Sequence, residues 1–180
     1  MGDMILTLPI IQALNRDKNE IDVICSQSNF KICNKLNIIN KIYLLQKNFS
    51  KILNTIIKIR KENYDYFFTF SPGILSILIS IFSGSKTKSL LILKSRYKNS
   101  FSSKMLEKIL GNFFYDYYLI VDRRLRFSKK NSIHQTELMK ELVIKSELKI
   151  NDIDEMKKLF HLQRVDYNLK KLCLIHLSSK

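Results

Sequence analysis

The first residues of the chain place a carboxylate at the start of an apolar helical pattern. Gly2 and Asp3 directly precede the segment Met4 to Asn15, in which apolar residues recur at helical spacing. Glycine lets the backbone turn tightly. An aspartate that opens a helix after a strand would lie beyond the carboxyl edge of the sheet, where open α/β proteins bind ligands. Asp3 can therefore face a ligand, or it can simply cap the helix by accepting hydrogen bonds from amides near Leu6.

Two groups of basic residues could bind anionic groups. Lys94, Arg96 and Lys98 follow a strand-like segment, where they could contact phosphates or acidic sugars. A second group comprises Arg123, Arg124 and Arg126. For both groups the alternative is a solvated surface without a ligand.

Cysteine and glycine spacing excludes several other kinds of site. Cys25, Cys33 and Cys173 form no CxxC pair and no Cys/His ligand spacing, so neither a zinc site nor a disulfide framework is expected. The 4 glycines form no cluster, which argues against the dinucleotide-binding fingerprint. The sequence thus predicts no metal site, and its cysteine usage fits a reducing, cytoplasmic setting.

The formal charge of +15 points to an anionic partner or to compositional background. Lysine supplies most of the excess, and it rises together with isoleucine and asparagine, as in AT-rich coding sequences. No recognition helix or aromatic–basic RNA motif is evident, so no nucleic acid partner is expected. A non-catalytic basic domain that binds nucleic acid or anionic membrane nevertheless remains the alternative to an enzyme.

Apolar stretches predict neither a leader nor a membrane span. Met1 is followed at once by Gly2 and Asp3 instead of a basic and then apolar leader. The longest apolar stretch, Phe67 to Phe82, is shorter than the roughly 20 residues of a spanning helix, and Pro72-Gly73 interrupts it. A buried strand, turn and helix explain this stretch better.

Helix-like and strand-like segments alternate along the chain. Expected helices are Met4–Asn15, Phe30–Leu36, Ser50–Lys61 with Ser50 as N-cap, Ile74–Phe82, Ser103–Phe114, Ile133–Val143 and Asn151–His161. Expected strands are Ile21–Cys25, Lys41–Leu45, Tyr64–Phe70, Lys88–Leu93, Tyr117–Val121 and Leu172–Leu177. Strands that alternate with helices over short connections predict an α/β fold, with a Rossmann-like parallel sheet and helices on both faces.

Both ends of this pattern suggest truncation. The chain opens on a turn and helix that should follow a strand, and it closes on a strand and polar loop that should lead into a helix. We expect a domain over residues 1–168 that lacks its first strand, followed by the start of another domain over residues 169–180.

The opening segment, Gly2 through Leu14, resembles the start of glycosyltransferase family 9, the lipopolysaccharide heptosyltransferases. Gly2, Asp3, Thr7, Pro9 and Leu14 match the family's order and spacing. Later segments agree in order. They are Ile21–Cys25, Asn37–Ile42, Tyr64-Asp65 with the strand that follows, Ile74–Gly84, His134-Gln135 before Glu137, and Leu174–Ser179.

The resemblance implies the amino-terminal half of a two-domain GT-B enzyme. Such enzymes are inverting and metal-independent, and they use no cofactor besides the nucleotide-sugar donor, here an ADP-heptose-like co-substrate. The acceptor would be a lipopolysaccharide core or a related anionic glycolipid, met in the cytoplasm or at the cytoplasmic face of the inner membrane. The chain alone, without the donor-binding half, is expected to be inactive.

The same resemblance assigns residue roles. Asp3 would be the catalytic base, with Gly2, Thr7 and the basic loop of Lys94, Arg96 and Lys98 on the acceptor side. Ser178 and Ser179 would form the loop that reaches donor phosphate. Thr69 and Ser71-Pro72 depart from the family pattern, in which an aspartate and a Gln-Gly are common, so acceptor details are expected to differ.

Overall fold

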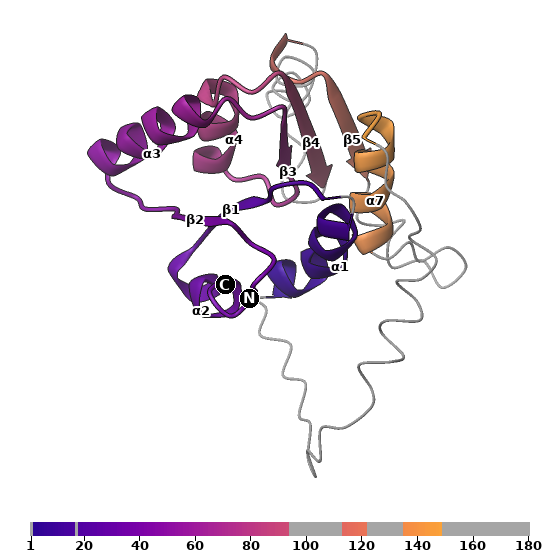
Figure 1. Cartoon of the computed structure of the whole chain (residues 1–180). Coiled ribbons are helices and arrows are strands. Elements are labelled where there is room, and N and C mark those ends of the chain that lie inside the picture. The colour runs from indigo at the N-terminus through magenta and orange to yellow at the C-terminus, as the bar shows by residue number, and fades with distance from the viewer. Residues whose placement is uncertain (1, 17, 94–112, 122–134, 149–180) are drawn as a thin grey trace, which may run out of the picture.

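The computed structural model describes residues 2–16, 18–93, 113–121 and 135–148 (Figure 1). Its helices are α1 (Gly2–Arg16), α2 (Gln27–Cys33), α3 (Phe49–Glu62), α4 (Ile74–Phe82) and α7 (Gln135–Lys145). Its strands are β1 (Asp22–Cys25), β2 (Lys41–Leu44), β3 (Tyr66–Thr69), β4 (Thr87–Leu93) and β5 (Tyr117–Val121). The predicted alternation of helices and strands is confirmed over these ranges.

The strands pair in parallel, as predicted, but in two groups. β1 pairs with β2, beginning with Asp22 opposite Lys41. β3, β4 and β5 form a second sheet in that order. The described residues place no strand between β1 and β3, so the sheet is divided there.

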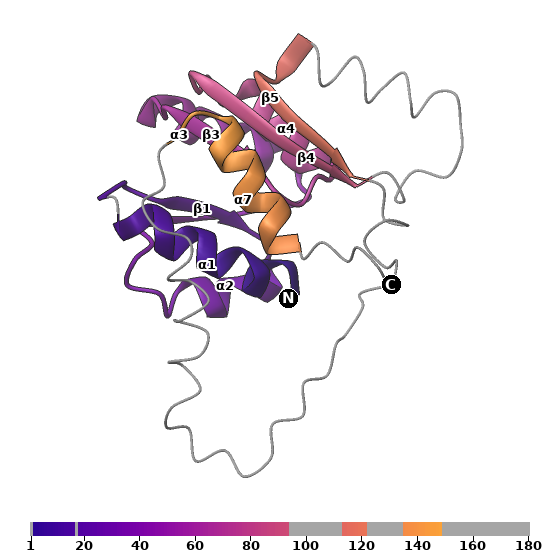
Figure 2. The same cartoon turned by 90° about the vertical axis from the view of Figure 1, so that its right-hand side faces the viewer.

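Helices cover both faces of the two sheets, which confirms the predicted fold class. α1, α2 and α7 lie over one face and α3 and α4 over the other, and Figure 2 shows α7 in front of β4 and β5 with α4 behind them. Successive strand residues point to opposite faces. In β4, Leu91 packs under α1 and α7, while Leu90 and Ile92 pack under α4.

Helices on each face contact strands of both sheets and so hold the two sheets side by side. On one face, Ile10 of α1 packs in a cluster with β4 and α7, while Ile11 packs in a second cluster with Cys25 of β1. On the other face, α3 and α4 share a cluster that includes Ile24 of β1 and Phe67 of β3. Apolar burial on both faces therefore joins the two sheets, between which the described residues form no backbone ladder.

Aspartates at the starts of strands bind the backbone of neighbouring strands. The backbone N–H of Lys41 donates to Asp22 Oδ1 at 2.9 Å, and that of Lys88 donates to Asp116 Oδ2 at 2.7 Å. The two carboxylates satisfy amides at the amino edge of each sheet, where the ladder ends. At this edge, the backbone N–H groups of Lys41 and Lys88 therefore both have a carboxylate partner.

Two details of the predicted helices were wrong. Helix α2 begins at Gln27 after Ser26, three residues before the predicted Phe30, because Asn29 and Phe30 already donate backbone bonds to Ser26. The N-cap of α3 is Asn48 instead of Ser50, because the Asn48 side chain accepts the Ser50 N–H at 3.0 Å. The predicted segments 151–161 and 172–177, and most of 103–114, lie outside the described residues.

No helix within the described ranges is long and apolar enough to cross a membrane.

Candidate functional site at the carboxyl edge

The amino ends of α1 and α7 lie together at the carboxyl edge of the sheet. The Lys145 ammonium at the end of α7 donates to the Tyr118 carbonyl at the start of β5, at 3.2 Å, so α7 runs antiparallel to β5. The Thr136 hydroxyl at the start of α7 donates to the Leu6 carbonyl of α1 at 3.2 Å. α1 therefore begins at the same edge as α7, which is where parallel α/β sheets bind ligands.

Two adjacent helix amino ends favour an anion at this edge. The amino end of a helix carries the positive end of the helix dipole, and its first backbone N–H groups have no partner within the helix itself. Gly2 and Asp3 form the first turn of α1, and Gln135 and Thr136 form the first turn of α7. A phosphate or carboxylate bound here would gain charge-assisted hydrogen bonds.

Thr7 lies in the contact between α1 and α7. Its hydroxyl donates to the Met139 sulfur at 3.8 Å, and Met139 itself is fully buried. The predicted acceptor-binding residue is thus one turn inside α1, against the neighbouring helix. Its binding role stays a prediction.

Thr136 belongs to this edge and was not singled out from the sequence. Its hydroxyl joins α7 to the first turns of α1. A threonine in the first turn of a helix is the type of residue that bonds local backbone, but its actual partner lies 130 residues away in the chain. No local pattern could have identified that partner.

The turn between β3 and α4 also lies at the carboxyl edge. The Gly73 N–H donates to Ser76 Oγ at 2.7 Å, which closes the start of α4. Thr69 ends β3 and is buried, with its hydroxyl on the α4 side near Ser80 and Tyr115. Burial raises the pKa of Tyr115, while the hydroxyls of Ser80 and Thr69 act in the opposite direction. The position at which the family commonly has an aspartate is therefore occupied here by an interior hydroxyl.

The thiol of Cys25 ends β1 at the same edge but is not poised for nucleophilic chemistry. Cys25 and Cys33 are both buried free cysteines. Burial, together with the charge and hydrogen bond of Cys33, raises the pKa of Cys25 to about 12. A thiol with such a pKa stays protonated at neutral pH and is a poor nucleophile.

The other predicted site residues cannot be placed. Lys94, Arg96, Lys98, Ser178 and Ser179 all lie outside the described residues, as do Arg123, Arg124, Arg126 and His134. Asp3 and Gly2 are placed as part of the α1 backbone. The backbone of Asp3 thus lies at the carboxyl edge, and its role as a base remains a prediction.

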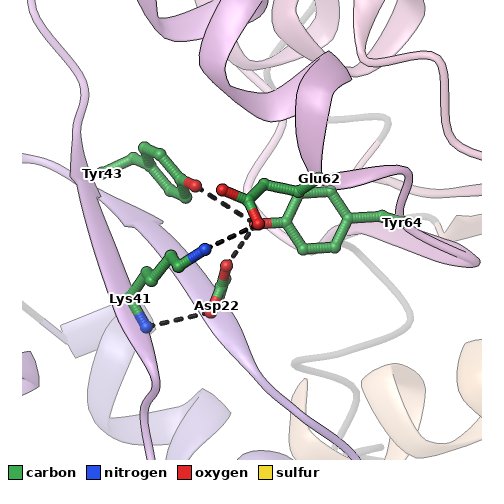
Figure 3. Close-up of polar contacts among 5 residues, drawn as sticks. All are labelled: Asp22, Lys41, Tyr43, Glu62 and Tyr64. Carbon is green, nitrogen blue, oxygen red and sulfur yellow. Dashed lines mark hydrogen bonds and ion pairs between the residues drawn. The ribbon is translucent and has the colours of Figure 1, made fainter.

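A second polar cluster lies at the opposite, amino edge of the sheet (Figure 3). The Tyr64 hydroxyl donates to Asp22 Oδ2 and lies 3.4 Å from the Tyr43 hydroxyl. The Lys41 ammonium forms an ion pair with Glu62 at 2.6 Å. Burial raises the pKa of Tyr64 well above its usual range, and its hydrogen bonds to Asp22 and Tyr43 add to the rise. The Glu62 hydrogen bond likewise raises the pKa of Lys41.

The amino-edge cluster joins the two sheets. Asp22 and Lys41 begin the paired strands β1 and β2, whereas Glu62 ends α3 and Tyr64 lies two residues before β3. Its groups bind one another, so it is a structural clasp with little capacity left for a ligand.

The described residues form no metal site, and a hollow at α2 lacks the groups expected of a catalytic site. Within the described ranges, no three His, Cys, Asp or Glu side chains come together as metal ligands. A surface hollow of about 460 Å³ is lined by α2 and the turn after it, residues 30–36. It contains no carboxylate and no strand residue, so we do not regard it as the site.

Comparison with known proteins supports the fold. The sequence matches no family model and no curated protein. A crystal structure of a glycosyl transferase family 9 protein from Veillonella parvula DSM 2008 is similar in fold, with a TM-score of 0.55 and 12% sequence identity. The similarity covers 93% of this chain and 47% of that one, so the chain spans about half the length of the structure it matches.

Proposed function

We propose that this chain is the acceptor-side part of a glycosyltransferase of the family 9 type. The similarity in fold over 93% of the chain carries the proposal. Two further features support it: the Gly2-Asp3 motif at the start of the chain, and the position of α1, whose amino end lies at the carboxyl edge. The proposed arrangement is GT-B, with the donor held mainly by a second domain.

The reaction is an inverting transfer of a heptose or similar sugar from a nucleotide-sugar donor to a lipopolysaccharide core or related glycan. The acceptor hydroxyl oxygen forms a bond to the anomeric carbon as the bond from that carbon to the nucleoside diphosphate breaks. Asp3 takes the hydroxyl proton as the new bond forms. In this mechanism no metal ion is required, because charge on the leaving phosphate is stabilised by protein groups.

The carboxyl edge is suited to an anionic acceptor. The adjacent amino ends of α1 and α7 attract negative charge. Lys94, Arg96 and Lys98 follow β4 in the sequence, and the carboxyl end of β4 belongs to the same edge. These residues would contact phosphates or acidic sugars of the acceptor, and Ser178 and Ser179 would contact the donor phosphate.

The test is an assay of sugar transfer by the full-length protein. The protein is incubated with ADP-heptose or related nucleotide-sugars and a lipopolysaccharide core acceptor, and nucleotide release and product are measured. Asp3→Asn should lower the rate about a hundredfold or more, because loss of a general base costs on the order of 10²–10⁴ in rate.

Asp65→Asn is the matched control, since it makes the same change of charge at an exposed residue of the amino edge. It should retain the parent rate. Transfer by Asp3→Asn within about twofold of the parent would exclude Asp3 as the base. Absence of transfer with every sugar donor would contradict the proposed function itself.

A further inference from the structure

The outer side of the α3–α4 layer carries six exposed apolar side chains. Both helices expose apolar residues at every fourth position. We call this set the apolar face; it consists of Phe49, Leu53 and Ile57 of α3, and Ile74, Leu78 and Phe82 of α4. Each row extends roughly 12 Å along its helix at 1.5 Å per residue. Single exposed apolar residues are ordinary, but two such rows on adjacent helices mark an interaction surface.

The two rows lie on neighbouring sides of the helices. α3 and α4 lie next to each other on the face of the sheet away from α1 and α7 (Figure 1), and they share a buried cluster. Arg60 lies one turn beyond Ile57 on the same side of α3. Its side chain packs against Gly84, the residue with positive φ that follows α4, with Cγ 3.5 Å from the position a Cβ would take. The apolar row of α3 is therefore on the side turned toward α4.

Positive charge borders the apolar face. Lys51, Lys58 and Lys61 lie on the remaining exposed side of α3, and α4 carries no charged residue. The nearby acids are already paired, Glu62 with Lys41 and Asp65 with Lys86. The lysine charges beside the apolar face are therefore not balanced by these two carboxylates.

We propose that the apolar face and its bordering lysines form a docking surface for an anionic lipid membrane. Apolar side chains beside lysines on an amphipathic helix are the pattern that binds the headgroup boundary of a bilayer. The long lysine side chains can reach anionic headgroups while the apolar rows enter the lipid. A symmetric dimer through this face would instead bring the lysines of two copies, each with a formal charge of +15, close together.

The position of the face connects it to the carboxyl edge. Phe49 and Ile74 are the first residues of α3 and α4, and they are its most exposed members, at 73% and 78%. Both helices begin at the edge at which α1 begins, because each follows a strand of the parallel sheets. A membrane bound there would hold lipid headgroups next to the candidate site. The inference does not rest on the proposed transferase activity.

The test is co-sedimentation of the full-length protein with lipid vesicles. Vesicles of phosphatidylcholine alone are compared with vesicles containing phosphatidylcholine and phosphatidylglycerol at 7:3. Binding should require the anionic lipid and weaken in high salt, since screening shortens the range of the lysine charges. Equal binding to both vesicle types, or to neither, overturns the proposal.

Ile57→Gln and Ile144→Gln provide a matched pair of variants. The two isoleucines are 53% and 54% exposed, but Ile144 lies on α7 in the opposite helix layer. Ile57→Gln should lower the partition coefficient about fivefold, and Ile57→Gln combined with Phe82→Gln about twentyfold, because less apolar area enters the lipid. Ile144→Gln should change it less than twofold, and all these exposed variants should keep the parent Tm within a few degrees. An equal loss from Ile57→Gln and Ile144→Gln overturns the proposal.

Charge is tested in the same way. Lys51→Gln, Lys58→Gln and Lys61→Gln together should lower binding to anionic vesicles about a hundredfold, at about fivefold per lysine. Lys31→Gln with Lys35→Gln, at exposed positions on the other face, is the control. Sedimentation equilibrium identifies the competing occupant. A dimer that Ile57→Gln dissociates, together with no vesicle binding, would assign the face to self-association and overturn the proposal.

Discussion

The two edges of the sheet differ in how their polar groups are used. At the amino edge, Asp22, Lys41, Glu62 and Tyr64 bind one another and join the two sheets. At the carboxyl edge, the helices α1 and α7 begin side by side, with their dipoles directed at the same region. Groups that bind one another stabilise the fold, whereas the positive ends of two helix dipoles at one edge favour an anionic ligand. This difference places Asp22 in a structural cluster and the backbone of Asp3 at the opposite edge.

The largest stability effect is expected from the amino edge. Tyr64→Phe removes the donor to Asp22 and leaves a half-buried carboxylate with one fewer partner, so the free energy of unfolding should fall by about 1–3 kcal/mol. Chemical denaturation monitored by circular dichroism measures it. Any catalytic rate per folded molecule should stay unchanged.

Tyr66→Phe is the matched control, because it removes a tyrosine hydroxyl from β3 outside the clasp. If both variants lose the same stability, the clasp has no special role. If Tyr64→Phe lowers activity without lowering stability, the two edges are not functionally distinct.

At alkaline pH, the buried thiol of Cys25 at the carboxyl edge should lower the free energy of unfolding. Its folded pKa, about 12, is above the ordinary value of 9.0 that applies to the unfolded chain. The folded state therefore holds the proton more tightly, and the resulting stability is present below the unfolded pKa and lost as pH rises toward the folded one. Between pH 8 and pH 10.5, we expect a loss of about 1–2 kcal/mol from this thiol.

The measurement is the slope of unfolding free energy against pH for the parent and for Cys25→Ala. The variant has its own cavity cost at every pH, so only the slope is compared. A shallower slope in Cys25→Ala supports the assignment, and an identical slope contradicts it. Tyr64 has its pKa raised in the same direction, so Tyr64→Phe should also flatten the curve above pH 10.

The smallest effect is expected from the exposed ion pair of the amino edge. The Lys86 ammonium lies 2.7 Å from Asp65 Oδ1, but the side chains are 76% and 68% exposed. Asp65→Asn should change the free energy of unfolding by less than about 0.5 kcal/mol, because solvent screens such pairs. A loss comparable to that of Tyr64→Phe in the same denaturation experiment would show that the whole edge acts as one network.

Much of the fold could be predicted from local patterns. The β-branched and aromatic segments became β1 to β5, and the parallel pairing followed from their alternation with helices. The Ile52, Ile56 and Ile59 positions of α3 pack inward as helical spacing implies. Leu53 and Ile57 belong to the same apolar pattern but remain exposed. Helical spacing shows which residues share a side, whereas the placement of α4 decides how much of that side is covered.

The candidate site was only partly predictable. The helix over Met4–Asn15 was predicted and is confirmed, but α1 begins earlier, at Gly2, so Gly2 and Asp3 form its first turn instead of preceding it. The pairing of α1 with α7 was not expected, because it depends on Thr7 meeting Met139 across 132 positions of sequence. The sequence shows Thr69 where the family commonly has an aspartate. The burial of Thr69 could not be predicted, because it depends on the packing of β3 against Ser80 of α4 and against Tyr115, which precedes β5.

The sequence by itself determined the alternation of elements, the parallel α/β class and the absence of a Cys/His ligand spacing, because these depend on residue type and short-range spacing. The tertiary structure alone decided that the described strands pair in two separate groups, that Tyr64 binds Asp22 across 42 positions, and that α1 and α7 begin together. Such contacts depend on how the helices pack across the two sheet faces. The same packing places Asp22 in a structural clasp at the amino edge and the first turn of α1 at the carboxyl edge.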